Sequence, residues 1–268
     1  SDLLGGVASW LAGVKSIVWG VHHTIANDTA LKPTTRMVLK LLVFFSHFLP
    51  KKIICCSESA VTTHVSLGYP QEKMITITNG VDYDRFRPDE SARKMLREEL
   101  GLPLPERLVG MFARYHPQKD HANFIHAAAL LSKKYADVHF ILSGENVDES
   151  NPDLTSLIVN SGIGDKVHLL GKRQDMPRLH AAMDINSLSS SFGEALPMAL
   201  CEGMSCGVPC VATRVGDVES LIDNTGKVVE PGNPNALAEA WLSILELGPV
   251  EYNELSNKAR QRILLYYG

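Results

Sequence analysis

A regular alternation of short strand-like runs with helical patterns is the feature that most constrains the fold. Each run is rich in β-branched and aromatic residues, and helical periodicity fills most of the gaps between runs. This alternation predicts right-handed βαβ crossovers and parallel sheets covered by helices on both faces, so the predicted fold class is α/β, doubly wound and Rossmann-like. The predicted strands are Ser16–Val21, Ile53–Cys56, Met74–Thr78, Leu108–Ala113, Val138–Ser143, Val167–Leu170, Ile185–Ser189 and Pro209–Thr213.

A charged, proline-containing segment divides this alternation into two domains. It runs from Asp82 to Pro105, and we place the boundary near residue 100. Residues 101–268 hold enough strands and helices for a complete Rossmann-like domain, whereas residues 1–100 hold only three clear strands. Such a domain normally needs about five or six parallel strands. We therefore expect an incomplete N-terminal domain, with sequence missing before residue 1, and the abrupt apolar end at Leu264–Gly268 suggests a second truncation there.

Composition narrows the function classes. A net charge of −4 over 268 residues gives no electrostatic reason to expect nucleic-acid binding. The cysteines are odd in number and scattered, which argues against a disulfide framework and favours a reducing cytoplasm. Their spacings do not match common zinc sites, so we expect them to be small buried hydrophobic residues. They are Cys55, Cys56, Cys201, Cys206 and Cys210.

The longest apolar run is too short and too often interrupted to span a membrane. It extends from Met37 to Leu49, below the ~18–20 residues that a spanning helix needs. Residues Leu39–Pro50, followed by Lys51 and Lys52, could lie on an anionic membrane surface. A helix packed in the core is the alternative, and we favour it.

Two carboxylates follow the seventh predicted strand. The sequence predicts a helix that begins near Ala195, with Pro197 in its first turn. On such a helix, Glu194 and Glu202 would be separated by a net rotation of about 80° and a rise of about 12 Å, so both could point into one cleft. Each could accept hydrogen bonds from a pair of hydroxyls, one pair on a hexose and one on a ribose. Two solvent-facing glutamates are the alternative, but apolar neighbours such as Leu196 favour a buried helix.

Two cations lie in the turn between the fourth predicted strand and the helix after it. Arg114 and Lys119 stand in this turn, and Asp120 is the candidate N-cap of the helix. Fixed cations near a helix N-terminus suit a diphosphate, and they would stabilise the negative charge that develops on a departing nucleotide. The alternative is a pair of unrelated loop cations in water.

Glycines and polar residues also end other strands. Backbone groups at Gly171, Lys172 and Arg173 could read the edge of a base, and Gly144 could approach a nucleotide. These residues form turns in the first place, so the prediction that they bind ligand is weaker than the one for Arg114 and Lys119.

An ordered set of motifs resembles glycosyltransferase family 4, whose members are retaining enzymes of the GT-B fold. The resemblance extends over residues 3–265. Its motifs are Asn79-Gly80-Val81-Asp82 with Arg85-Phe86 and Pro88, the loop with Arg114 and Lys119, Ser191–Glu202, Gly207-Val208-Pro209 and Thr213–Asp217.

The resemblance implies roles for individual residues. Arg114 and Lys119 would bind the donor diphosphate, Glu202 the ribose hydroxyls and Glu194 the transferred sugar, in a site that also includes Ala195, Leu196 and Pro197. A family histidine that faces the donor sugar would be His23, which we favour slightly over His22. The resemblance also implies that transfer needs no bound metal.

The function that the resemblance implies is transfer of a sugar, with retention, from a UDP- or GDP-linked donor to a saccharide or lipid-linked acceptor. Surface polysaccharide or glycoconjugate synthesis in the cytoplasm, at the inner face of the membrane, would be the setting. The chain departs from the family pattern at its ends, because an N-terminal strand with a glycine-rich loop and a long C-terminal crossover helix are not evident. A non-catalytic nucleotide-sugar-binding fragment therefore stays open, as does a sugar-nucleotide epimerase or a phosphorylase of the same fold.

Overall fold

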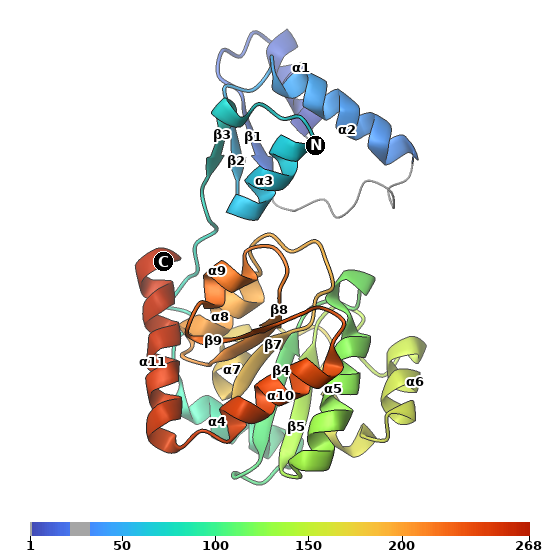
Figure 1. Cartoon of the computed structure of the whole chain (residues 1–268), viewed down its shortest axis with the longest axis vertical. Helices are drawn as coiled ribbons and strands as arrows, with labels where there is room; N and C mark the ends of the chain where they lie inside the picture. Colours follow the sequence, from blue (N-terminus) through green and yellow to red (C-terminus); the bar gives the residue numbers. More distant parts are fainter. Residues whose placement is uncertain (1, 22–32) are drawn as a thin grey trace. The chain divides into compact units, whose positions relative to one another are not determined.

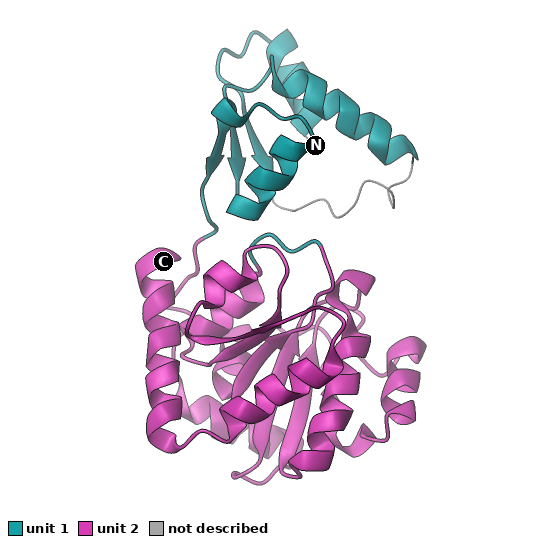
Figure 2. Cartoon of the chain, in the orientation of Figure 1, with its two compact units in different colours: residues 1–79, 193–196 teal, residues 80–192, 197–268 magenta. Residues whose placement is uncertain are grey.

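The computed structural model describes residues 2–21 and 33–268 and divides the chain into two compact units. The first unit comprises residues 1–79 and 193–196, and the second comprises residues 80–192 and 197–268 (Figure 2). Each unit is built around its own parallel sheet, which confirms the α/β prediction.

The first unit contains a three-stranded parallel sheet in the order β1-β2-β3. The side chains of Trp19, Ile53 and Met74, one from each strand, are buried in its apolar core. These three strands are the ones that the sequence predicted for this part of the chain. The elements are α1 (Asp2–Leu11), β1 (Val18–Val21), α2 (Pro33–Ser46), β2 (Lys52–Cys55), α3 (Glu58–Ser66), η2 (Gln71–Lys73) and β3 (Met74–Thr76).

The second unit contains a six-stranded sheet in the order β6-β5-β4-β7-β8-β9, with every neighbouring pair parallel. The chain builds outward from β4 in one direction and then returns to build outward from β7 in the other. This reversal creates a topological switch point between β4 and β7, at whose carboxyl ends open α/β sheets bind ligands. The strands are β4 (Arg107–Phe112), β5 (Val138–Ser143), β6 (Val167–Leu169), β7 (Ile185–Leu188), β8 (Cys210–Thr213) and β9 (Gly226–Val229).

Two groups of helices cover this sheet (Figure 1). In one group α5 packs against both α6 and α10, and in the other α7 joins α4 to α8, which packs against α11. The helices are α4 (Glu90–Leu100), α5 (His121–Lys134), α6 (Pro152–Asn160), α7 (Met176–Ala182), α8 (Met198–Ser205), α9 (Val218–Ile222), α10 (Pro234–Leu245) and α11 (Pro249–Tyr266), with 3-10 turns η3 (Pro117–Lys119) and η4 (Gly164–Lys166).

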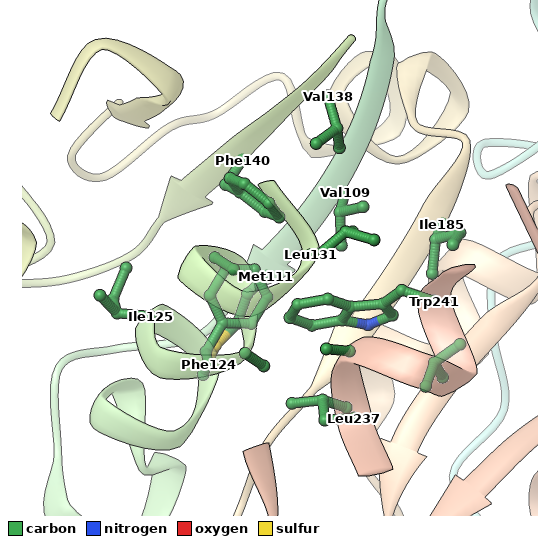
Figure 3. Close-up of a cluster of buried hydrophobic side chains, with 14 of the residues drawn as sticks. Val109, Met111, Phe124, Ile125, Leu131, Val138, Phe140, Ile185, Leu237 and Trp241 are labelled. Atoms are coloured by element: carbon green, nitrogen blue, oxygen red, sulfur yellow. The ribbon is translucent and has the colours of Figure 1, made fainter. Parts of the chain in front are cut away.

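An aromatic cluster forms the centre of the core in the second unit. The ring centroid of Trp241 lies 5.0 Å from that of Phe124 and 6.0 Å from that of Phe140. Figure 3 shows the indole among these rings and the aliphatic side chains of α10 and the central strands. Its Nε1 donates a 3.0 Å hydrogen bond to Ser187 Oγ on β7, which satisfies the one polar group of the buried ring.

The structure refines the strand boundaries. Each predicted strand matches one of β1 to β8 within two residues at either end, whereas β9 is not among the predicted runs. Its sequence, Gly226–Val229, is short and begins with a glycine and a lysine, so it lacks a clear strand pattern.

The division between the units also falls earlier than the predicted boundary near residue 100. The second unit begins at Gly80, so α4 belongs to it. The reason is the buried Arg97 of α4, whose guanidinium donates to Asp184 Oδ2 at 3.0 Å, at the amino end of β7. Charge and proline content mark this segment as a connection but do not reveal this ion pair.

The cysteines are free and buried, as the sequence predicted. Burial raises the pKa of the Cys201 and Cys206 thiols to about 12 and that of Cys55 to about 11. Within residues 2–21 and 33–268, no set of three metal-ligating side chains is placed to hold an ion, and no helix is both long and apolar enough to cross a membrane.

Candidate nucleotide-binding site

The turn after β4 is fixed by hydrogen bonds to the end of β5. Ala113 N donates to Ser143 O at 3.0 Å, and Tyr115 N donates to Glu145 O at 2.8 Å. These bonds extend the parallel pairing past the last residue of β4. The backbone of Arg114 is thereby held at the carboxyl edge of the sheet, beside the switch point, and its side chain is exposed there.

Gly144 allows the two strand ends to approach this closely. A Cβ atom on Gly144 would lie 2.2 Å from Ala113 O and 2.9 Å from Arg114 N, so no other residue fits without movement of the backbone. Gly144 N donates to Gly171 O at 2.9 Å, which joins the turn after β6 to the same edge. Gly144 therefore sets the shape of the turn that carries Arg114.

The cation at the other end of the turn, Lys119, lies directly before helix α5. Asp120 adopts the left-handed conformation, with φ of 48°, and its carboxylate accepts a 3.1 Å hydrogen bond from Asn123 N. This confirms the predicted N-cap. Ser189 Oγ, just past β7, donates to the carbonyl oxygens of both Lys119 and Asp120 at 2.9 Å. The start of α5 is therefore tied to the switch-point strand.

A neutral histidine follows this cap. Burial lowers the pKa of His121 to about 4, and the positive charge of Lys119 acts in the same direction. The ring packs against Tyr115, with centroids 5.1 Å apart. The positive charge at this edge therefore comes from Arg114, Lys119 and the N-terminus of α5 rather than from His121.

Glu202 belongs to α8, the helix that follows β7 in the chain, and its carboxylate contacts a buried histidine. Its Oε2 is 3.1 Å from His180 Nε2, and His180 Nδ1 is 2.9 Å from Asn186 Oδ1 on β7. The Glu202 side chain stays 26% exposed, whereas that of His180 is 1% exposed. Neither His180 nor Asn186 is among the site residues predicted from the sequence. A histidine in a short apolar helix gives no signal of its partners, which come from β7 and α8.

The start of α8 differs from the prediction. The helix begins at Met198, with Pro197 as its N-cap, rather than near Ala195. Proline fixes φ and lacks an N–H, which suits the boundary position. Glu194 therefore precedes the helix, and the helical rotation that we used to relate it to Glu202 does not apply. Residues 193–196, including Ala195 and Leu196, are grouped with the first unit.

The turn after β6 is already occupied by interactions within the protein. Gly171 N donates to Val147 O at 2.9 Å, and Gly171 O accepts from Ser143 Oγ at 2.7 Å as well as from Gly144 N. Its backbone groups are therefore engaged. Lys172 is exposed beside it.

Arg173 has partners of its own, because its guanidinium binds Asp175 at 2.8 Å and Glu99 at 2.7 Å. The hydrogen bond to Asp175, followed by that to Glu99, raises the pKa of Arg173 above its usual range. Its side chain is thus held by protein carboxylates. The remaining predicted residues, His22 and His23, lie outside the described residues.

Comparison with known proteins identifies the family to which these motifs belong. The family model described as glycosyl transferases group 1 matches residues 106–247, and the model described as glycosyltransferase family 4 matches residues 1–85. The structure of Anabaena HepE in complex with UDP-glucose superposes with a TM-score of 0.88 at 25% identity, covering 99% of this chain and 72% of that one. This similarity confirms the predicted GT-B class.

Two curated relatives show the same extent of similarity. The Escherichia coli protein named UDP-Gal:alpha-D-GlcNAc-diphosphoundecaprenol alpha-1,3-galactosyltransferase is 26% identical, over 98% of this chain and 68% of that protein. D-inositol 3-phosphate glycosyltransferase from Corynebacterium urealyticum is 26% identical, over 91% of this chain and 61% of that protein. The chain thus spans about two thirds of these relatives. It belongs to the group 1 glycosyl transferases, and its residues 1–85 match glycosyltransferase family 4.

Proposed function

We propose that this chain provides the donor-binding part of a retaining glycosyltransferase, which moves a hexose from a UDP- or GDP-linked donor to a saccharide or lipid-linked acceptor. The observation that carries the proposal is the arrangement of the second unit. The turn with Arg114 and Lys119 and the helix with Glu202 flank the same switch point, where α/β sheets bind nucleotides.

The proposed chemistry needs charge at two ends of the donor. Arg114, Lys119 and the N-terminus of α5 would hold the diphosphate and stabilise the charge that develops as the nucleotide leaves. Glu202 would accept hydrogen bonds from the two ribose hydroxyls. Glu194 and His23 would contact the transferred sugar, as the family resemblance implies. The acceptor would attack from the face that the nucleotide leaves, and the departing phosphate would take its proton.

The names of similar proteins support a nucleotide-sugar donor. HepE was solved with UDP-glucose, and the Escherichia coli relative is named for a UDP-galactose donor and a lipid-linked acceptor. The setting that we propose is the synthesis of a surface polysaccharide or glycoconjugate at the inner face of the membrane.

Helix α2 supports peripheral contact with a membrane in that setting. One face of the helix packs on the core of the first unit through Leu42 and Val43, in agreement with the favoured core position. On the helix, however, Met37 and Phe44 are 60% and 59% exposed, and Phe48, beyond it, is 71% exposed. Lys51 and Lys52 follow, so apolar and basic side chains occur together. We expect the chain to co-sediment with anionic vesicles and not with neutral ones. Equal sedimentation with both kinds of vesicle, or none with either, would contradict this proposal.

A donor-consumption assay tests the proposed function. The chain is incubated with UDP-glucose, UDP-galactose and GDP-mannose, with and without a lipid-linked saccharide, and the released nucleoside diphosphate and saccharide product are identified. Release that Arg114→Ala abolishes, and that Lys133→Ala at the far end of α5 leaves intact, is the expected result. Binding without release would favour a nucleotide-sugar-binding fragment, and an isomerised sugar still joined to its nucleotide would favour an epimerase.

A further inference from the structure

His180, the buried histidine that contacts the Glu202 carboxylate, packs between two aromatic rings. The imidazole of His180 lies edge-on to Phe112, with centroids 4.6 Å apart at 78°, and to Phe86, with centroids 5.8 Å apart at 72°. Phe112 ends β4 and Phe86 belongs to the segment before α4. The ring therefore has one orientation, with its two nitrogens directed along the line from β7 to α8.

Helix α8 approaches β7 closely enough to complete this line. A Cβ atom on Gly203 would lie 2.5 Å from Asn186 Nδ2, so α8 packs directly on the Asn186 side chain. Glu202 is the next residue back along the helix. The sequence Glu202-Gly203 thus brings the carboxylate and the helix backbone to the same pair of residues, His180 and Asn186.

The imidazole connects an amide on β7 to the carboxylate on α8. Asn186 Nδ2 donates to His180 O at 3.4 Å, which directs the Asn186 carbonyl oxygen toward His180 Nδ1 at 2.9 Å. On the other side of the ring, Nε2 lies 3.1 Å from Glu202 Oε2. A hydrogen bond that a carboxylate accepts is charge-assisted, so this contact can hold Glu202 in one orientation.

We propose that His180, oriented by Asn186, is a positioning residue that holds the Glu202 carboxylate in the orientation that binds the donor ribose. A glutamate on a helix samples several rotamers, and a fixed partner on Oε2 restricts them before the ligand arrives. The inference rests on the proposed function, because it assigns a support to the residue proposed to bind the ribose.

The test measures discrimination by the ribose hydroxyls. Calorimetric titration compares UDP with 2′,3′-dideoxy-UDP, and GDP with its dideoxy analogue, on the wild-type chain and on His180→Phe. The phenyl ring preserves the packing against Phe112 and removes both nitrogens. The control is His168→Phe, which removes a half-buried histidine from β6.

The wild-type chain and the control should prefer the hydroxylated nucleotide by at least about tenfold, the effect of one hydrogen bond to a charged group. His180→Phe should reduce that preference to within about threefold and leave the affinity for the dideoxy analogue unchanged. An equal loss of affinity for both ligands with the preference intact would overturn the inference and leave His180 a merely structural residue. If the wild-type chain bound neither UDP nor GDP, the proposed function itself would fail.

A measurement on the wild-type chain covers the case in which His180→Phe does not fold. In nitrogen-15 NMR of the imidazole rings, the His180 signals should shift on addition of the bound nucleoside diphosphate but not of its dideoxy analogue. His180 signals that respond equally to both ligands, or to neither, would overturn the inference.

Discussion

The two ends of the six-stranded sheet use the same kinds of charged residue in opposite ways. At the amino end, the buried carboxylate of Asp184 binds Arg93 and Arg107 at 2.8 Å and Arg97 at 3.0 Å, and it also accepts from Leu108 N. At the carboxyl end, Arg114 is exposed and Lys119 half-buried at the start of α5. Arginine at one end therefore neutralises a buried charge, and arginine at the other is exposed where we propose that the donor binds.

The largest change in stability should follow removal of the buried Asp184 carboxylate at the amino end of the sheet. Asp184→Ala leaves three guanidinium groups around an apolar side chain, and Arg97 among them is buried. We expect a loss of about 3–5 kcal/mol in the free energy of unfolding of the second unit, measured by urea denaturation. The exposed control Asp137→Ala should stay within about 0.5 kcal/mol of wild type. A loss below about 1 kcal/mol for Asp184→Ala would contradict a structural role for the cluster.

Substitution at the carboxyl end should lower activity and leave stability nearly unchanged. We expect Arg114→Ala to lower kcat/KM for the nucleotide-sugar donor by about 10²–10³-fold, equivalent to about 3–4 kcal/mol of transition-state stabilisation. Because the side chain is exposed, the free energy of unfolding should change by less than about 0.5 kcal/mol. Steady-state kinetics and urea denaturation on the same preparation check both. A large loss of stability would remove the contrast between the two ends.

Gly144 should affect both the stability of the second unit and the turn that carries Arg114. Gly144→Ala should cost about 1–3 kcal/mol in the free energy of unfolding, because the new methyl group would overlap Ala113 O. It should also weaken donor binding, because Arg114 N lies beside the same position. The matched control is Gly164→Ala, where a Cβ atom meets nothing within 4 Å. If Gly144→Ala were as stable as this control, Gly144 would not shape the turn.

The smallest of these effects should be the change in the free energy of unfolding with pH near neutrality. The pKa of His121 is about 4 in the folded protein and about 6.5 in the unfolded chain, so the unfolded state binds the proton first as pH falls. The stability contribution is complete above about pH 6.5 and is lost as pH falls toward 4, with less than about 1 kcal/mol lost at pH 6. His121→Gln should flatten the dependence of unfolding on pH in this window, and His126→Gln, at an exposed position, should not.

Much of this architecture could be predicted from the sequence, because parallel strands and their helices carry local patterns. The strands β1 to β8, the cap at Asp120 and the turn with Arg114 and Lys119 all depend on residues close together in the chain. The missed features depend on distant pairs. Asp184 meets Arg97 across 87 residues, and His180 meets Glu202 across 22, and no periodicity marks these partners.

Local rules also failed where two of them competed. Pro197 suits the first turn of a helix and also its boundary, and the structure uses it as the N-cap of α8. The helix therefore starts three residues later than predicted. The position of Glu194 in the donor site consequently depends on the segment before the helix, which helical periodicity cannot describe.

Calorimetric titration of this chain with UDP, GDP and ADP and their sugars tests most directly the claim that the carboxyl end of the second sheet binds a nucleotide sugar. We expect binding of a UDP- or GDP-linked sugar that both Arg114→Ala and Glu202→Ala weaken and that Asp137→Ala leaves unchanged. Binding that survives both substitutions undiminished, or no binding of any of these nucleotides by the folded wild-type chain, would contradict it.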